Sequence, residues 1–170
     1  LIKQKKIHGV ELVNGFEYYP KAFNYCDEYG LTYMGNTDLH GVYKQTYRTD
    51  RQSGPITIVF AKERTEAGVK EALFAGRSVA KFGDLLIGSE KNLLALAKAC
   101  LSYEVMAVNG NIATVKVVNK STLTFNIMQD NRMNTILGNA TVEFKVRLDD
   151  KLRFANTYIT DDSQLVVDVA

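Results

Sequence analysis

The chain has 170 residues, enough for one or two small domains, with the 46% hydrophobic and 24% charged content of an ordinary globular protein. Because 21 basic residues are nearly matched by 19 acidic ones, the net charge of +2 gives no reason to expect a nucleic-acid partner. No apolar run reaches the roughly 18 residues of a membrane span, and the start shows no signal-peptide pattern. Cys26 and Cys100 are expected as buried thiols, which leave the compartment of the protein undetermined.

The first part of the chain alternates between strand and helix patterns. Residues 10–13 form a short apolar strand that contains Glu11, and residues 31–34 predict a second, buried strand. Between them, Pro20 suits the first turn of a helix and Gly30 suits its end. A strand, a helix and a strand within about 30 residues predict a right-handed βαβ unit.

Further strands and helices follow up to about residue 101. Residues 56–60 are rich in β-branched side chains and predict a strand. Thr65 is a good N-cap for a helix at 66–75, and Gly76 is a suitable stop. Residues 78–80 suggest one more short strand, and Ser89 caps a predicted helix at 90–101.

From about Ser102 the helical spacing gives way to strict alternation. Asn109-Gly110-Asn111 separates two alternating runs at 103–108 and 112–118, which is a strong hairpin signal. Further alternating strands are expected at 123–127, 140–146, 152–159 and 165–169. Such short strands predict an antiparallel sandwich. The expected fold class is therefore α+β, with an α/β domain at 1–101 and a small β-sandwich at 102–170.

Asp38 and His40 are the most informative polar residues, because they follow directly after the predicted strand at 31–34. The carboxyl ends of strands are where chemistry takes place in α/β barrels. A carboxylate oxygen and an imidazole nitrogen two residues apart suit a divalent cation such as zinc, manganese or iron. A loop cap or a satisfied polar pair gives the same pattern, so the motif alone leaves both interpretations open.

Three more polar residues are candidates for contacts with a ligand. Arg48 and Arg51 lie in the polar loop 41–54, and guanidinium groups are well shaped for binding phosphate, although both could be ordinary surface residues. Glu11 points either to solvent at a sheet edge or into a polar barrel mouth.

Three fragments, in this order, resemble parts of a known family. They are HGVELVN at residues 8–14, MGNTDLH at 34–40, and TIVFAKERT at 57–65 followed by EALFAGR at 71–77. On these fragments, residues 7–101 resemble the C-terminal half of a PHP-domain (polymerase and histidinol phosphatase) metal-dependent phosphoesterase, and the third fragment resembles its phosphodiesterase branch. The resemblance implies a partial PHP-type βα barrel.

The resemblance also implies roles for individual residues. Asp38 and His40 would be ligands in a cluster of two or three metal ions, with Glu11 and Asn14 nearby as supporting or substrate contacts. The reaction would be hydrolysis of a phosphate mono- or diester by a metal-activated water. The family's opening His-x-His, central Glu and further His ligands have no counterpart here, where His8 and His40 are the only histidines. We therefore expect the chain to be a fragment of a longer enzyme. The isolated fragment is expected to be inactive and to bind metal weakly or not at all.

Two other interpretations remain at this point. The chain could be a non-catalytic module whose β-sandwich recognises a sugar, a peptide or a partner subunit, or the sandwich could simply cap the barrel. An incomplete barrel would leave an open sheet edge, so self-association through that edge is also expected. Neither nucleic acid nor a membrane is expected as a partner.

Overall fold

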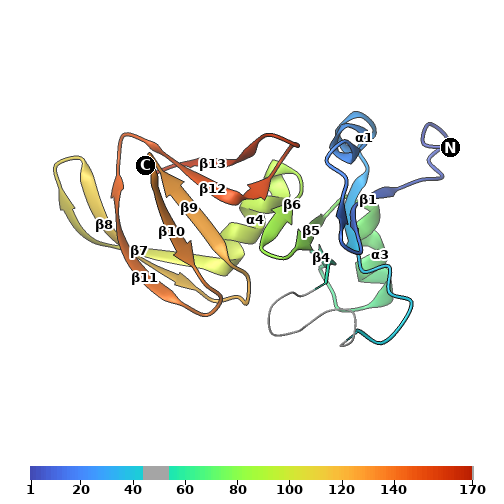
Figure 1. The fold of residues 1–170 in the computed structure, drawn as a ribbon, viewed down its shortest axis with the longest axis horizontal. Helices are drawn as coiled ribbons and strands as arrows, with labels where there is room; N and C mark the ends of the chain where they lie inside the picture. The colour runs from blue at the N-terminus through green and yellow to red at the C-terminus, as the bar shows by residue number, and fades with distance from the viewer. Residues whose placement is uncertain (44–53, 170) are drawn as a thin grey trace. The chain divides into compact units, whose positions relative to one another are not determined.

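A computed structural model describes residues 1–43 and 54–169 of the chain. Two compact units are present, and each is described by itself (Figure 1). The N-terminal unit comprises Leu1–Asn92 and Tyr158–Ser163, and the C-terminal unit comprises Leu93–Thr157 and Gln164–Ala170. The domain boundary at 101/102 stays a prediction. No helix in the described ranges is long and apolar enough to cross a membrane.

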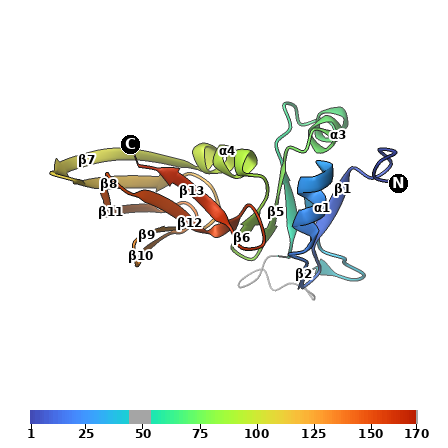
Figure 2. The same ribbon diagram turned by 90° about the horizontal axis from the view of Figure 1, so that it is seen from above.

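The N-terminal unit begins with the predicted strand, helix and strand. β1 (Gly9–Asn14) and β3 (Thr32–Asn36) pair in parallel, and α1 (Ala22–Tyr29) connects them. A short β2 (Glu17–Tyr18) pairs antiparallel with the end of β1. Gly30 ends α1 in the left-handed conformation, with φ at 62°, as the sequence predicted. Figure 2 shows α1 beside β1 in this unit.

The core of this unit is built on consecutive apolar residues of β1. Leu12 and Val13 are both fully buried, and Phe23 and Cys26 of α1 belong to the same apolar cluster. Burial raises the pKa of the Cys26 thiol to about 12, with a smaller contribution from the charge of Asp27. Both cysteines of the chain are buried and free, as expected.

The next three strands are antiparallel. β4 (Ile56–Val59) pairs with β5 (Ser78–Phe82), which pairs with β6 (Leu85–Ile87). Between β4 and β5 lies α3 (Glu66–Phe74), whose predicted N-cap Thr65 accepts a hydrogen bond from the Gly68 N–H at 3.0 Å. Strands of a βα barrel run parallel, so β4 to β6 depart from the barrel pattern expected from the sequence. The turn between β5 and β6 is far too short for the crossover that a parallel pair needs.

Hydroxyl groups connect β3 to β4 and β5. Thr57 Oγ1 accepts a hydrogen bond from the Gly35 N–H at 3.0 Å and donates one to the Gly35 carbonyl at 2.9 Å. Ser78 Oγ donates to the Tyr33 carbonyl at 2.7 Å. A Cβ atom at Gly35 would lie only 3.3 Å from the Cβ of Ala80, so glycine permits this close approach of the backbones.

Two sets of strands form the C-terminal unit, which begins within α4 (Glu90–Cys100). One set is an antiparallel sheet in the order β11-β8-β7, made of β7 (Leu101–Asn109), β8 (Ile112–Asn119) and β11 (Thr141–Arg147). The other pairs in the order β10-β9-β12, made of β9 (Phe125–Gln129), β10 (Arg132–Ile136) and β12 (Lys151–Tyr158). Finally, β13 (Gln164–Asp168) pairs with β12.

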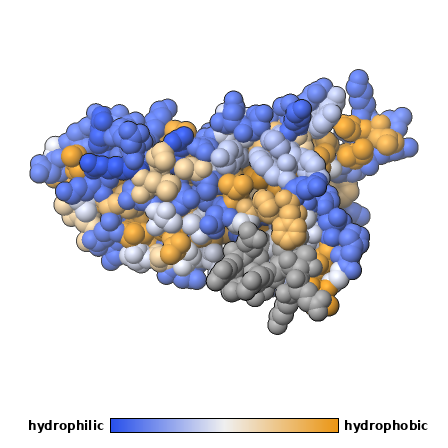
Figure 3. Space-filling view, in the orientation of Figure 1, coloured by the Kyte–Doolittle hydropathy of each residue, from blue (hydrophilic) through white to orange (hydrophobic). Residues whose placement is uncertain are grey.

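The predicted hairpin of the C-terminal unit is confirmed, and one strand was missed. β7 and β8 pair up to Asn109 and Ile112, with Gly110 at a φ of 58° in the turn. The missed strand is β10. The buried Asn119 holds the connection after β8, because its Nδ2 donates to the Leu123 carbonyl at 2.6 Å and its Oδ1 accepts from the Ser121 N–H at 3.0 Å. Figure 3 shows hydrophilic residues over much of the visible surface of this unit, with apolar ones scattered between them.

Candidate functional site

A bulge in β1 determines which of its side chains face the candidate site. The register against β3 shifts between Glu11 and Val13, so that β1 contains one residue more than its partner there. Side chains alternate along a regular strand, and residues three apart would point to opposite faces. The extra residue at the bulge shifts this alternation by one position. Glu11 and Asn14 therefore lie on the same face, at the carboxyl end of β1.

Two amide groups hold the Glu11 carboxylate. Asn14 Nδ2 donates to Oε2 at 2.6 Å, and Asn36 Nδ2 donates to Oε1 at 2.5 Å. Asn14 and Asn36 are direct partners in the parallel register, so both amides stand at the ends of their strands. An amide has two N–H groups and one oxygen, and each Asn gives one N–H to Glu11. The carboxylate is half-buried and fixed in position by neutral donors.

Asp38 and His40 lie just beyond β3 and contact each other. His40 Nε2 is 3.2 Å from Asp38 Oδ1, a distance that makes an ion pair when the imidazole is protonated. Asp38 has a φ of 48°, in the left-handed region that Asp tolerates better than most residues. Their side chains are 57% and 86% exposed, so both can accept a further partner from solvent.

Negative charge accumulates around this end of the sheet. Tyr19, which follows β2, donates a hydrogen bond to the carboxylate of Glu17. This hydrogen bond is the main cause of a raised pKa of Tyr19, and the charges of Asp38 and Glu11 contribute less. The carboxylates of Glu17, Asp38 and Glu11 therefore all lie close enough to act on one phenol group.

The described residues contain no complete set of metal ligands. In residues 1–43 and 54–169, no group of three or more His, Cys, Asp or Glu side chains could hold a metal ion. Asp38 and His40 are ligands of the right chemistry, but zinc in catalytic sites has three protein ligands. Glu11 is already hydrogen-bonded through both oxygens. The Asp38 and His40 side chains have donor atoms that a divalent cation accepts, but by themselves they are too few to form such a site.

The other candidate residues are placed as follows. Arg48 and Arg51 lie outside the described residues. His8, which the sequence assigned to no ligand position, packs its ring against Phe74 at a centroid distance of 4.3 Å. Sequence reasoning missed Asn36 and Tyr19 as members of the cluster. Asn36 lies directly opposite Asn14 in the register of β1 and β3, and this pairing cannot be derived from the sequence alone.

Comparison with known proteins gives one informative similarity. No family model matches the chain, and no curated protein matches it. Among solved structures, it is similar to a two-domain protein from Bacteroides vulgatus ATCC 8482, described as containing a predicted PHP-like metal-dependent phosphoesterase. The TM-score is 0.89 at 26% sequence identity, over 98% of this chain and 53% of that chain. This chain therefore spans about half of that two-domain protein, to which it is similar in fold and sequence.

Proposed function

We propose that this chain is the C-terminal part of a PHP-like metal-dependent phosphoesterase that hydrolyses phosphate mono- or diesters. The observation that carries the proposal is the contact between Asp38 and His40, directly beyond the strand ends that hold the Glu11 carboxylate. The similarity to the two-domain protein supports it. In this proposal the N-terminal unit contributes the last parallel strands of a βα barrel, and the C-terminal unit is a small antiparallel β-sandwich.

In the proposed enzyme, the acidic and histidine side chains and the two amides have different roles. Asp38 and His40 bind the metal, for which zinc, manganese and iron are the candidates. When bound, such an ion lowers the pKa of water and stabilises negative charge on phosphoryl oxygens. Glu11 fixes the amides of Asn14 and Asn36, whose remaining polar atoms can bind a substrate oxygen. Removing Glu11 would release both amides, so its effect on activity would be indirect.

The remaining ligands belong, in this proposal, to residues outside this sequence. Two protein ligands leave a metal ion without a closed first shell, so the 170-residue chain alone should bind metal weakly and hydrolyse no phosphate ester. We also propose that the chain self-associates through an open strand edge. Light scattering tests it, since a monomer at all concentrations contradicts it.

The experiment is a hydrolysis assay on the longer protein that contains this chain. Its substrate is a generic phosphodiester with added manganese or zinc, and it compares wild type with Asp38→Ala and His40→Ala. We expect a loss of turnover of roughly a hundredfold or more, because even residues that only support metal ligands contribute about 10–100-fold. Unchanged turnover in both variants would remove the pair from the site.

A matched control is offered by the other histidine. His8→Ala removes the same side chain from a position where the ring packs on Phe74. Turnover of this variant should stay within about twofold of wild type, because such a substitution removes no group that stabilises the transition state. An equal loss in His8→Ala and His40→Ala would indicate a general structural effect.

A further inference from the structure

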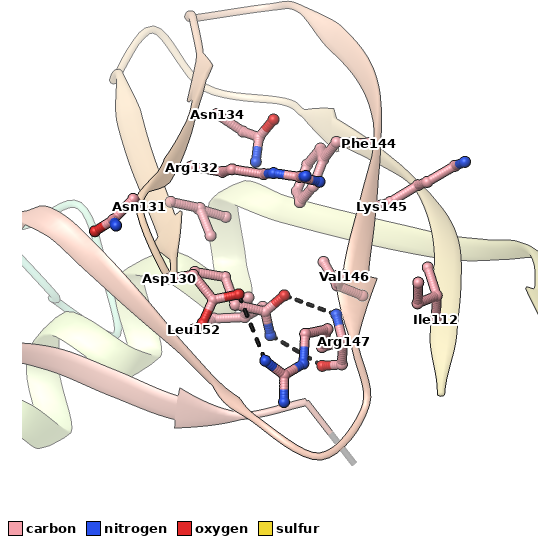
Figure 4. A pocket seen from close by; sticks show the side chains of 12 residues that line it. Ile112, Asp130, Asn131, Arg132, Asn134, Phe144, Lys145, Val146, Arg147 and Leu152 are labelled. Carbon is pink, nitrogen blue, oxygen red and sulfur yellow. Dashed lines mark hydrogen bonds and ion pairs between the residues drawn. The ribbon is translucent and has the colours of Figure 1, made fainter. Parts of the chain in front are cut away.

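A second candidate site lies in the C-terminal unit, in a cavity of about 400 Å³ between its two sets of strands (Figure 4). Its walls come from β8, β9, β10, β11 and β12. The apolar part is formed by Ile127, Phe144, Val146 and Leu152. The volume is within the range of roughly 300–1,000 Å³ that is typical of sites for small molecules.

Polar residues occupy positions of β10 that face this cavity. Directly paired residues of an antiparallel ladder share a face of the sheet. Arg132 pairs with the buried Gln129, Asn134 pairs with the buried Ile127, and the next pair on this face, Phe125 and Ile136, is fully apolar. The alternation thus places a guanidinium and an amide on the same face of β10 as the buried Ile136, although Arg132 itself is exposed and Asn134 is half-buried.

Two other charged residues at this cavity, Asp130 and Arg147, are paired with each other. Gln129 Oε1 accepts from the Arg147 N–H at 2.7 Å, and Gln129 Nε2 donates to the Arg147 carbonyl at 2.9 Å. The Arg147 guanidinium lies 3.7 Å from Asp130 and 3.1 Å from Asp149. These contacts fasten β11 to the end of β9 and use the nearby carboxylates. They do not involve Arg132.

Arg132 has no ion-pair partner in residues 1–43 and 54–169. Figure 4 shows its side chain extending from β10 in the direction of Phe144, with Asn134 above it, whereas Lys145 points the other way. A guanidinium without an ion-pair partner and an aromatic ring that line the same cavity offer two complementary surfaces. One binds an oxyanion and the other binds a flat apolar body.

We propose that this cavity binds a small organic anion, whose carboxylate or phosphate pairs with Arg132 and whose ring or short apolar body lies against Phe144 and Leu152. Asn134 donates a further hydrogen bond to the same anionic group. The site is independent of the metal ligands Asp38 and His40, which belong to the other unit. The proposal therefore does not rest on the phosphoesterase function.

The test is a titration of the full chain, followed by two-dimensional NMR of the Arg side-chain Nε–H and Asn side-chain amide signals. The probes are benzoate, phenylphosphonate and the neutral analogue benzamide. We expect saturable shifts of the Arg132 and Asn134 signals with at least one of the two anions, in the range of about 1 mM or below. Benzamide should bind at least roughly tenfold more weakly, since charge-assisted hydrogen bonds are about twice as strong as neutral ones. The stronger of the two anions identifies whether carboxylate or phosphate is preferred.

Two variants decide whether Arg132 is the anchor. Arg132→Gln should weaken binding of the preferred anion by about tenfold or more, because it removes the bidentate charged donor. Arg153→Gln removes the same group from β12, where Arg153 pairs with Met128 on the opposite face of the sheet. This control should keep the affinity of wild type within about twofold. Thermal unfolding of both variants verifies that they are folded.

Several results would overturn the proposal. Absence of saturable shifts with either anion up to about 20 mM would exclude a useful site. Equal binding of benzamide and the anions would show that no anion is recognised. Unchanged affinity in Arg132→Gln, or an equal loss in Arg153→Gln, would exclude Arg132 as the anchor.

Discussion

At the scale of single residues, the hydroxyl of Thr57 makes the clearest structural contribution. It bonds to both backbone polar groups of Gly35, as donor and as acceptor. Thr57→Val keeps the shape of the side chain but removes both hydrogen bonds. We expect a loss of about 1–3 kcal/mol in the free energy of unfolding, the usual cost of leaving buried polar groups unsatisfied. Urea unfolding measures it, and Thr57→Ser, which retains the hydroxyl, should lose clearly less.

A second residue-scale prediction concerns alkaline pH. The pKa of Cys26 is about 12 in the folded chain, compared with 9.0 for an unperturbed thiol. Between these values the unfolded chain loses the thiol proton while the folded chain keeps it, so stability falls as pH rises. The contribution is fully present below about pH 9 and is lost as pH rises through the folded pKa near 12.

The measurement is urea unfolding at several pH values between about 8 and 11, for wild type and Cys26→Val. Burial also raises the pKa of Tyr18 and Tyr33, so both proteins should lose stability at alkaline pH. The slope with pH should be smaller in Cys26→Val, because it lacks one of the groups that titrate. Identical slopes would contradict the assignment to Cys26.

Sequence alone was informative about some members of the candidate site and not about others. Asp38 and His40 were singled out by their types and spacing, and the family resemblance favoured a role as metal ligands, which stays a prediction. Glu11 and Asn14 came from the family resemblance, and their contact could not be derived from alternation. Asn36 was missed because its role depends on the register between β1 and β3, which no local pattern determines.

At the scale of secondary-structure elements, α3 provides a direct test of a predicted start signal. Thr65 Oγ1 accepts from the Gly68 N–H at 3.0 Å. Thr65→Ala should lower the free energy of unfolding by about 1 kcal/mol, and Thr65→Ser should have a smaller effect. Chemical denaturation checks both values. If Thr65→Ala were as stable as wild type, the hydrogen bond seen at this end of α3 would be without energetic importance.

Most elements follow from local rules, and the exceptions have physical causes. The Gly30 C-cap of α1, the Thr65 N-cap of α3 and the alternation in β8 and β11 are local signals that predicted these elements well, whereas Pro20 lies before the start of α1 and not in its first turn. β10 was missed because Arg132 and Asn134 interrupt the apolar alternation on its inner face. The antiparallel arrangement of β4 to β6 depends on which strands meet in space, so it could not be obtained from the sequence.

At the scale of the whole molecule, the late segment Tyr158–Ser163 belongs to the N-terminal unit. The Gly88 N–H donates to the Tyr158 carbonyl at 3.1 Å, and the Tyr158 side chain packs against the apolar core of that unit. A fragment ending at residue 101 lacks this segment. We expect it to unfold at a lower urea concentration than the N-terminal unit does in the full chain, since a buried apolar contact and a backbone hydrogen bond are lost.

This expectation is checked by amide hydrogen exchange on residues of β1 and β3 in both proteins. Faster exchange in the fragment supports the contribution of the late segment. Equal protection would mean that residues 1–101 are a self-sufficient domain, as the boundary predicted from the sequence implies. The result therefore also decides where a domain boundary can be drawn for expression of the separate parts.

Because of the bulge in β1, the direction of the Glu11 side chain depends more on the number of residues in this strand than on their types. Substitution at Leu12 would alter packing, whereas gain or loss of one residue between Glu11 and Asn14 would turn the carboxylate to the other side of the sheet. Natural variation in residues 9–14 should accordingly consist of replacements without insertions or deletions. In an alignment, a gap within this segment would mark a protein in which the carboxylate no longer meets the two amides.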